Sequence, residues 1–331
     1  MRKSVCGVLE DLCEAHDSAL ALEHLTEAGI DRLALPAAGQ TLARWRILAQ
    51  VAAHDLSLAK LFEGHTDALA ILAELGGPAA LTGSRWGTWC AEPPDARVVM
   101  SRDGPHVRLV GTKAWCSGAA QVTHAIVSCW NGDGEPCLAA VQMNQPGVEV
   151  TGDGWLAVGM AASSSVDVRF DGAEAIQVGG PHDYVRRLGF WHGGAGIAAC
   201  WLGGALGIAN MARAHTGAAA DPHRRAHVGA MDVALAGALA VLREAAAWID
   251  AQPRDDARRV ALRARLVVEQ AAADVMHHAG RAVGAGPLCR DARFARAMAD
   301  LPVFLRQSHA ERDLAALGES VDDAKDDPWV L

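Results

Sequence analysis

The spacing of apolar residues predicts helices at both ends of the chain. Toward the N-terminus they recur every three or four positions, which is the period of one helical face. The expected helices cover residues 9–25, 41–53 with Thr41 as the N-cap, and 66–75, which is ended by Gly76-Gly77-Pro78. A similar pattern, rich in Ala, Leu and Arg, returns at about residue 182 and is broken at 217–222, 252–256 and 280–287.

The middle of the chain follows a different pattern. Between Trp86 and Val178, short β-rich runs alternate with turn signals such as Asp171-Gly172. Strands are expected at 97–101, 107–116, 124–130, 137–143, 148–151, 164–170 and 175–178. Because no helical period separates these runs, they predict an antiparallel barrel or sandwich. The predicted class is α+β, with a helical domain at 1–85, a β domain at 86–180, a helical domain at 181–320 and an acidic tail at 321–331.

Composition and charge narrow the class of protein. Hydrophobic residues make up 51% of the 331 residues, enough for a large core, and this length suggests about two domains. With 30 Lys+Arg against 39 Asp+Glu, the net charge of -9 argues against nucleic acid or an anionic membrane as a partner. The 8 cysteines are scattered without a CxxC pair, which favours a reduced, cytoplasmic setting over a disulfide framework.

Other local features are assigned to packing or surface roles. The uncharged stretch 188–211 is long enough to cross a bilayer, but its many Gly and Ala residues insert weakly and permit close helix packing. The N-terminus has no apolar run before its first acidic residues, so no signal peptide is expected. His223 and His227 share a helix face, but no third ligand accompanies them, and no metal site is expected.

The β region carries more specific chemistry. Indoles, glycines and small hydroxyl residues recur at predicted strand ends, in WGTWCAEP (86–93), GTKAWCSGA (111–119) and GMAASSSVDVRF (159–170). An indole can stack on a flat heteroaromatic ring, and a serine hydroxyl beside it can donate a hydrogen bond to a ring nitrogen. The alternative is that these tryptophans are ordinary core or rim residues.

These segments resemble those of the acyl-CoA dehydrogenase family of flavoproteins, in the same order along nearly the whole chain. WCAEP resembles the family's x-x-T-E-P segment, GTKAWCSGA its G-x-K-x-W-I-T-N-A segment, and GMAASSSVDVRF its G-M-R-x-S-x-T-x-x-V-x-F segment. AGRAVGAGPLCRDAR (279–293) resembles its glycine loop and R-D-A-R stretch. The resemblance implies N-terminal helices, a β-barrel and a C-terminal four-helix bundle, with FAD at the subunit contacts of a homodimer or homotetramer.

Carried over by position, the resemblance implies a flavin site. Trp115 would flank the isoalloxazine ring, and the Ser117 hydroxyl would approach its N5 edge. The chain departs from the family pattern at 220–225, which replaces the pyrophosphate-binding R-x-x-F-G segment, and at the Thr of T-E-P, which is Ala here. The expected cofactor-binding residues are Trp89, Cys90, Ala91, Trp115, Cys116, Ser117, Arg224, Gly284 and Gly286.

The catalytic base is the largest departure from the family pattern. In the family a Glu removes the α-proton of an acyl thioester while hydride passes to flavin N5, but its two positions fall on Ala299 and near Ile197 here. Asp300 is the nearest carboxylate, with a surface position before Pro302 as its alternative role. His309 is the second candidate base, with a solvated, charged helix face as its alternative.

The resemblance leaves more than one function open. The first is α,β-dehydrogenation of an acyl substrate, such as a CoA thioester, by an FAD-dependent oxidoreductase with an unidentified electron acceptor. The second is a flavin-dependent monooxygenase or oxidase on the same fold, with His309 in the base role. The third is a non-catalytic homologue that serves as an interaction subunit, which the departures from the motifs would explain.

Overall fold

The chain forms two compact units. The computed structural model describes residues 5–11, 18–103, 106–217, 221–323 and 329. Contacts group Met1–Leu35 with Ser57–Phe190 in what we call the β unit, and Pro36–Leu56 with Trp191–Leu331 in what we call the helical unit. The division into domains expected from the sequence stays a prediction, and most of the expected acidic tail lies outside the described residues.

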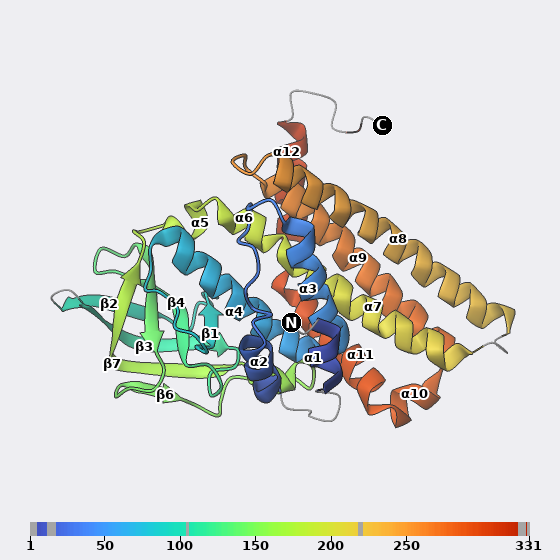
Figure 1. Ribbon diagram of the computed structural model, residues 1–331, viewed down its shortest axis with the longest axis horizontal. Helices are drawn as coiled ribbons and strands as arrows, with labels where there is room; N and C mark the ends of the chain where they lie inside the picture. The colour runs from blue at the N-terminus through green and yellow to red at the C-terminus, as the bar shows by residue number, and fades with distance from the viewer. Residues whose placement is uncertain (1–4, 12–17, 104–105, 218–220, 324–328, 330–331) are drawn as a thin grey trace. The chain divides into compact units, whose positions relative to one another are not determined.

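Helices flank a block of strands in the order of the chain (Figure 1). The elements are α1 (Val5–Asp11), α2 (Ser18–Glu27), α3 (Thr41–His54), α4 (Leu56–Leu75), β1 (Trp86–Trp89), β2 (Val98–Asp103), β3 (His106–Cys116), β4 (His124–Trp130), β5 (Pro136–Gln142), β6 (Val148–Val150), η1 (Ala161–Ser163), β7 (Val166–Val178), α5 (Asp183–Arg186), α6 (Gly189–Gly194), α7 (Gly196–Thr216), α8 (Pro222–Ala251), α9 (Arg258–Val283), α10 (Ala285–Arg290), α11 (Ala292–Phe304), η2 (Leu305–Gln307) and α12 (Glu311–Asp322).

The strands of the β unit close into a barrel. Around the ring the order is β4-β2-β3-β7-β5, and β5 pairs with β4 again; β1 pairs with β4, and β6 with β7. The pairs β1–β4 and β2–β4 are parallel, and the others are antiparallel, so the sheet is mixed where a wholly antiparallel one was expected. The α+β class with a β-barrel between helical segments is confirmed.

The barrel strands have apolar residues on both faces. The centres of β4 and β5 are buried throughout, as their near-continuous apolar sequences require. Leu109 and Val168 belong to the core on one face of the sheet. On the other face, Ile71 of α4 belongs to a separate core with Trp86 and Leu138. The barrel strands are therefore packed by apolar cores on both faces.

Two features of the strands differ from the expectation. β1 was not predicted: its two tryptophans and its threonine are of types that favour strands, but the run has only four residues and Gly87 interrupts it. The expected turn at Asp171-Gly172 is instead an irregularity inside one long strand, β7. Gly172 has a φ of 72°, and the pairing of β7 with β3 shifts there by one residue, which is the geometry of a β-bulge.

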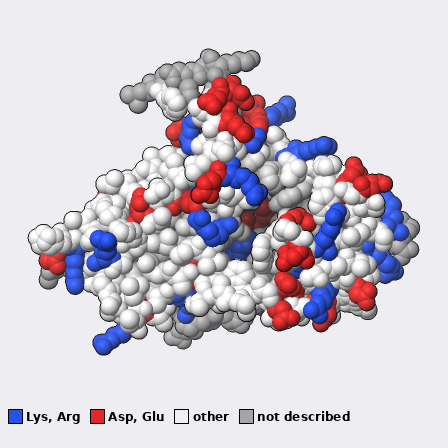
Figure 2. Space-filling model, turned by 180° about the vertical axis from the view of Figure 1, so that it is seen from behind, with Lys and Arg blue, Asp and Glu red and all other residues white. Residues whose placement is uncertain are grey.

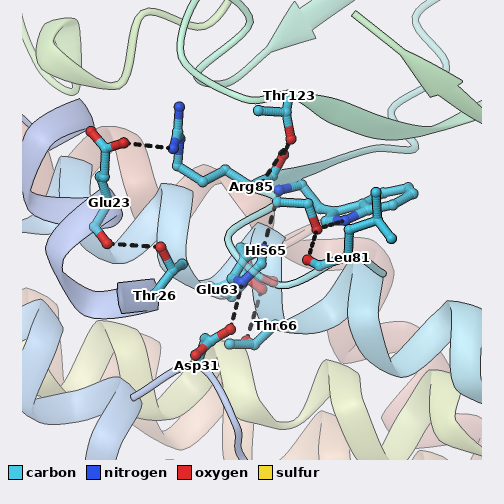
Figure 3. A network of polar contacts seen from close by, with 11 residues as sticks. Glu23, Thr26, Asp31, Glu63, His65, Thr66, Leu81, Arg85 and Thr123 are labelled. Carbon is cyan, nitrogen blue, oxygen red and sulfur yellow. Dashed lines mark hydrogen bonds and ion pairs between the residues drawn. The ribbon is translucent and has the colours of Figure 1, made fainter. Parts of the chain in front are cut away.

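Polar contacts tie the N-terminal helices to the barrel (Figure 3). The backbone N–H of Trp86 donates to His65 Nδ1 at 3.1 Å, which leaves His65 Nε2 to carry the proton toward Asp31 Oδ2 at 3.3 Å. Arg85, which directly precedes β1, donates from Nη1 to Glu23 Oε1 at 3.1 Å. These bonds join segments that are distant in sequence and fix where β1 begins.

Small residues set the packing of the helical unit. An added Cβ at Gly203 of α7 would lie 2.2 Å from the carbonyl oxygen of Ala49 in α3, so only glycine allows the two helices to approach this closely.

The expected N-cap at Thr41 is wrong. Gln40 holds the N-cap position, and the N–H and Oγ1 of Thr41 both donate to the carboxylate of Asp250 at the end of α8.

Two helical stretches are long and apolar enough to cross a membrane by length and composition alone. In Gly189–Thr216 the most apolar window is 72% buried, as is usual for a core helix of a soluble protein, whereas in Pro222–Ala251 it is 22% buried.

Figure 2 shows acidic and basic side chains interspersed on the face drawn, rather than one continuous basic surface. The expectation that the protein has no nucleic-acid or membrane partner stays a prediction.

Candidate functional site

The end of β3 presents the indole of Trp115 to solvent. The pairing of β3 with β7 is irregular between Lys113 and Cys116, and Trp115 has a φ of 58°. An irregularity of this kind can redirect a side chain, and here 50% of the Trp115 surface is exposed. A left-handed backbone costs a residue other than glycine about 1–2 kcal/mol, so this exposed indole is held at an energetic cost. Such strain is typical of binding and catalytic sites.

The neighbouring loop, residues 160–165, is bonded to this strand end. Ser117 Oγ lies 2.7 Å from Ser165 Oγ, and the Gly118 N–H donates to the Ser163 carbonyl oxygen at 2.8 Å. Met160 and Ser164 also have positive φ values, of 58° and 44°. Of the non-glycine residues with left-handed backbones in the described chain, which are Ala37, Trp115, Met160, Ser164, His182 and Ala310, half belong to these two linked segments.

Trp89 contacts this site from within the barrel core. Its side chain is buried in the barrel core, and its indole Nε1 donates to the carbonyl oxygen of Ser117 at 3.0 Å. Gly87 makes room for that indole, because an added Cβ there would lie 2.7 Å from Trp89 Nε1. The indole of Trp89 is therefore placed to orient the backbone of Ser117, and Trp115 is the one that faces solvent.

The predicted cysteines direct their thiols away from solvent. Cys116 is fully buried, and its Sγ donates to the Lys113 carbonyl oxygen at 3.2 Å. Burial raises the pKa of the Cys90 thiol to about 11, and it also raises the pKa of the Cys116 thiol. Neither thiol is poised to ionise near neutral pH, and Cys116 has no exposed surface, so the backbone of half-buried Cys90 and exposed Ala91 are the parts available to a ligand.

A buried ion pair joins the end of β3 to the segment that follows β1. The ammonium group of Lys113 has no exposure to solvent; it pairs with Glu92 and donates to Ser128 Oγ at 2.6 Å. Glu92 also accepts from Trp130 Nε1 at 3.0 Å and from Ser128 Oγ. Burial alone would raise the pKa of Glu92, but the hydrogen bonds from Lys113, Ser128 and Trp130 outweigh it and hold the pKa below its ordinary value.

The sequence prediction missed Glu92, Lys113, Ser163 and Ser165 as members of the site. All four lie inside the segments on which the family resemblance rests, so a signal was present. Their roles depend on contacts across many residues, such as the Ser117–Ser165 hydroxyl pair, and no local pattern shows these contacts.

The two candidate bases lie in the helical unit. Asp300 of α11 is buried and lines a cavity of about 30 Å³, together with Arg293, Arg296 and residues of α3 and α7. A cavity of that size has room for about one or two water molecules. His309 precedes α12 and is 65% exposed, with Nδ1 3.4 Å from Asp313 Oδ1. The structure thus places Asp300 inside the unit and His309 at its surface.

The other predicted cofactor residues also lie in the helical unit. Arg224 is in the first turn of α8, where its Nε lies 3.6 Å from the carboxylate of Asp221, the N-cap residue. Gly284 has a φ of 71°, and a Cβ added at Gly284 or Gly286 would meet nothing within 4 Å. The structure brings Trp89, Trp115 and Ser117 together in the β unit, while contacts between these residues and those of the helical unit stay predictions.

The described residues hold no group of three or more His, Cys, Asp or Glu side chains that could bind a metal ion. His227 contacts a histidine of another helix, since its Nδ1 lies 3.0 Å from Nδ1 of His278 on α9. A pair of this kind on two adjacent helices is a surface contact with two ligand atoms at most.

Solved structures of other proteins resemble this chain over nearly its whole length. Methanesulfinate monooxygenase MsuC from Pseudomonas fluorescens is 19% identical, with a TM-score of 0.84 over 97% of this chain and 96% of that one. The fold is of the acyl-CoA dehydrogenase type. Dibenzothiophene monooxygenase TdsC from Paenibacillus sp. A11-2 is 18% identical, with a TM-score of 0.83 over 98% and 97% of the two chains. Nitrososynthase from Micromonospora carbonacea var. africana is 19% identical, with a TM-score of 0.79 over 96% and 94%.

The comparison by sequence gives no match, either to a protein-family model or to a curated protein. The structural likeness therefore concerns the fold, and the activity of this chain is argued from its own residues below.

Proposed function

We propose that this protein is a flavin-dependent monooxygenase. The observation that carries the proposal is the half-exposed, strained Trp115 beside the Ser117 hydroxyl, at a strand end where the family resemblance predicts the isoalloxazine ring. A flat apolar face next to a polar edge is what a tricyclic redox ring requires. The structural likeness to the monooxygenases MsuC and TdsC supports the choice of reaction.

The residues of the β unit have distinct parts in this proposal. The Trp115 indole would stack on the ring and Ser117 would face its polar edge, while the Glu92–Lys113 pair holds the segment after β1 against the end of β3. When bound, reduced flavin supplies the electrons with which molecular oxygen is split, one oxygen atom going to the substrate and the other leaving as water. FMN is a candidate beside the FAD expected from the sequence, because TdsC has been solved with FMN.

The absence of a suitable base favours oxygenation over dehydrogenation of an acyl thioester. The expected positions of the base hold Ala299 and Ile197, neither of which can take a proton. Asp300, the nearest carboxylate, is buried in the helical unit beside a cavity of about 30 Å³. Monooxygenation needs no carboxylate at those positions. His309, at the exposed start of α12, stays the candidate base of this second reaction.

Spectroscopy of the purified full-length protein tests the proposal. Oxidised and reduced FMN and FAD are each titrated into the protein under anaerobic conditions, and binding is followed by flavin absorbance and by quenching of tryptophan fluorescence. We expect at least one flavin to bind, and substrate-dependent oxygen uptake once a separate reductase supplies reduced flavin. Reduction of bound flavin by acyl-CoA without oxygen would support the dehydrogenase instead. No binding of any flavin would refute both and favour an interaction subunit.

We further propose that the chain forms a homodimer or homotetramer through α8. This helix of 30 residues is apolar but largely unburied, and Val233 at its middle is 74% exposed. Around Val233 the outward positions are small, including Ala226, Gly229, Ala236 and Ala240, which would allow another helix to approach closely. Val233→Glu is expected to shift the mass measured by light scattering toward the monomer, whereas Leu314→Glu on α12, a matched exposed position, is not.

A further inference from the structure

The hydroxyl groups of Ser117, Ser165 and Ser163 form a chain of hydrogen bonds. Ser163 Oγ donates to the carbonyl oxygen of Met160 at 2.7 Å. Ser163 Oγ lies 2.8 Å from Ser165 Oγ, which in turn lies 2.7 Å from Ser117 Oγ. Ser163 and Ser165 are both buried, so protein atoms rather than bulk water decide which group donates to which.

Counting protons fixes the direction of this chain. A serine hydroxyl has one proton to donate and two lone pairs with which to accept. Ser163 uses its proton on the Met160 carbonyl, so Ser165 is the donor to Ser163. Ser165 has then used its own proton, so Ser117 is the donor to Ser165. The proton of Ser117 points into the protein, and its lone pairs are what remains for a ligand.

This direction reverses the expectation from the sequence. A serine beside the ring was expected to donate a hydrogen bond to a ring nitrogen. In the structure the hydroxyl of Ser117 can act only as an acceptor toward a ligand unless the chain of hydrogen bonds is broken. The ligand atom that faces Ser117 must therefore be a donor, or an unfavourable pair of acceptors results.

We propose that Ser163 and Ser165 are positioning residues that make Ser117 select reduced flavin over oxidised flavin. N5 of the oxidised isoalloxazine ring is an acceptor, whereas N5 of the reduced ring carries a proton and donates. An acceptor at Ser117 therefore binds the reduced ring better and opposes the oxidised ring. This inference rests on the proposed function. It explains how a monooxygenase that takes reduced flavin from solution would release the spent, oxidised form.

The ratio of the dissociation constants of oxidised and reduced flavin, measured anaerobically on the full chain, tests this proposal. Ser165→Ala removes the acceptor of the Ser117 proton, and Ser117 can then turn and donate to the oxidised ring. We expect the ratio to fall about tenfold, which lowers the midpoint potential of the bound two-electron couple by about 30 mV. Ser163→Ala should act in the same direction. Ser165→Thr keeps the hydroxyl and should keep the wild-type ratio, as should Ser101→Ala, an exposed control on β2.

The outcomes separate this inference from the proposed function. Wild-type protein that binds neither form of flavin would overturn both. Wild-type protein that binds flavin, with an unchanged ratio in Ser165→Ala, would overturn the inference alone.

A second measurement does not depend on any variant folding. Neutron diffraction of the flavin-free wild-type protein after exchange into D₂O locates the deuterium on Ser117 Oγ. Deuterium directed at Ser165 supports the proposal, and deuterium directed at solvent overturns it.

Discussion

Replacing Glu92 by glutamine would leave the ammonium group of Lys113 without its counter-charge. Lys113 Nζ has no exposure to solvent, and its other partners are Ser128 Oγ at 2.6 Å and the Ser128 carbonyl oxygen at 3.1 Å, both uncharged. Removing one partner of a fully buried ion pair costs about 3–5 kcal/mol of stability. Because 32% of the Glu92 side chain is exposed, we expect a loss of about 2–4 kcal/mol.

The assay is guanidinium denaturation of wild-type protein, Glu92→Gln and a matched control, followed by tryptophan fluorescence. The control is Glu174→Gln, which makes the same substitution in a surface pair with Arg108, whose two side chains are 61% and 41% exposed. Surface pairs of this kind contribute about 0–1 kcal/mol. Losses that are equal in the two variants, both below about 1 kcal/mol, would refute the argument that the buried ammonium depends on Glu92.

The same pair predicts a dependence on pH. The pKa of Glu92 lies below its ordinary value of 4.5, so between these two values the unfolded chain binds more protons than the folded one. The stabilisation by Glu92 is therefore complete above its ordinary pKa and is lost as the pH falls through the lower, folded-state value. The difference in stability between wild-type protein and Glu92→Gln should be constant near neutral pH and shrink in acid. A difference that grows in acid would contradict this assignment.

Three further predictions concern packing and strain, each measured as a change in stability against wild-type protein. Gly203→Ala should cost about 1–3 kcal/mol, since its Cβ meets the backbone of the facing helix, whereas Gly318→Ala on exposed α12, with nothing within 4 Å, should gain up to about 1 kcal/mol; a gain at both would contradict the close packing. Asp31→Ala should cost about 1–3 kcal/mol, because it removes the acceptor of the buried His65 Nε2–H. Trp115→Gly should change stability by less than about 1 kcal/mol, because relief of the left-handed backbone offsets the lost packing. The same substitution should weaken flavin binding at least about tenfold, and an unchanged flavin affinity would contradict the stacking role.

Much of the fold could be predicted from the sequence because its signals are local. The strand expected at 124–130 is observed at His124–Trp130, and the one expected at 107–116 begins one residue earlier, at His106. These strands have apolar runs bounded by turn residues. β1 was not found in this way, because its run of four residues is short and is interrupted by Gly87. The helix expected from residue 66 also proved longer, since α4 begins at Leu56.

The site was predicted in outline, and its chemistry was not. The motif comparison drew attention to Trp115 and Ser117, which the structure places side by side on one strand end. It could not give the direction of the Ser117 hydroxyl, which depends on Ser165 and on Met160 in a distant loop. It also did not identify Lys113 as a member of the site, because the burial of Lys113 depends on its contact with Glu92. Hydrogen-bond direction and burial are properties of the assembled barrel, and a linear motif does not contain them.

The balance of strain and hydrogen bonds at this site argues that it is formed before any ligand arrives. Trp115, Met160 and Ser164 each have a left-handed backbone, which together cost about 3–6 kcal/mol. Against this stand the Ser117–Ser165 and Ser163–Ser165 bonds, the bond from Ser163 to Met160, the Gly118–Ser163 backbone bond and the Trp89 bond to Ser117, worth together about 5 kcal/mol at about 1 kcal/mol each. The two sums are equal within their precision, so the exposed indole and the inward-pointing hydroxyl can persist in the free protein. A ligand that stacks on Trp115 and donates to Ser117 then binds without first having to order the site, and its affinity is not reduced by that cost.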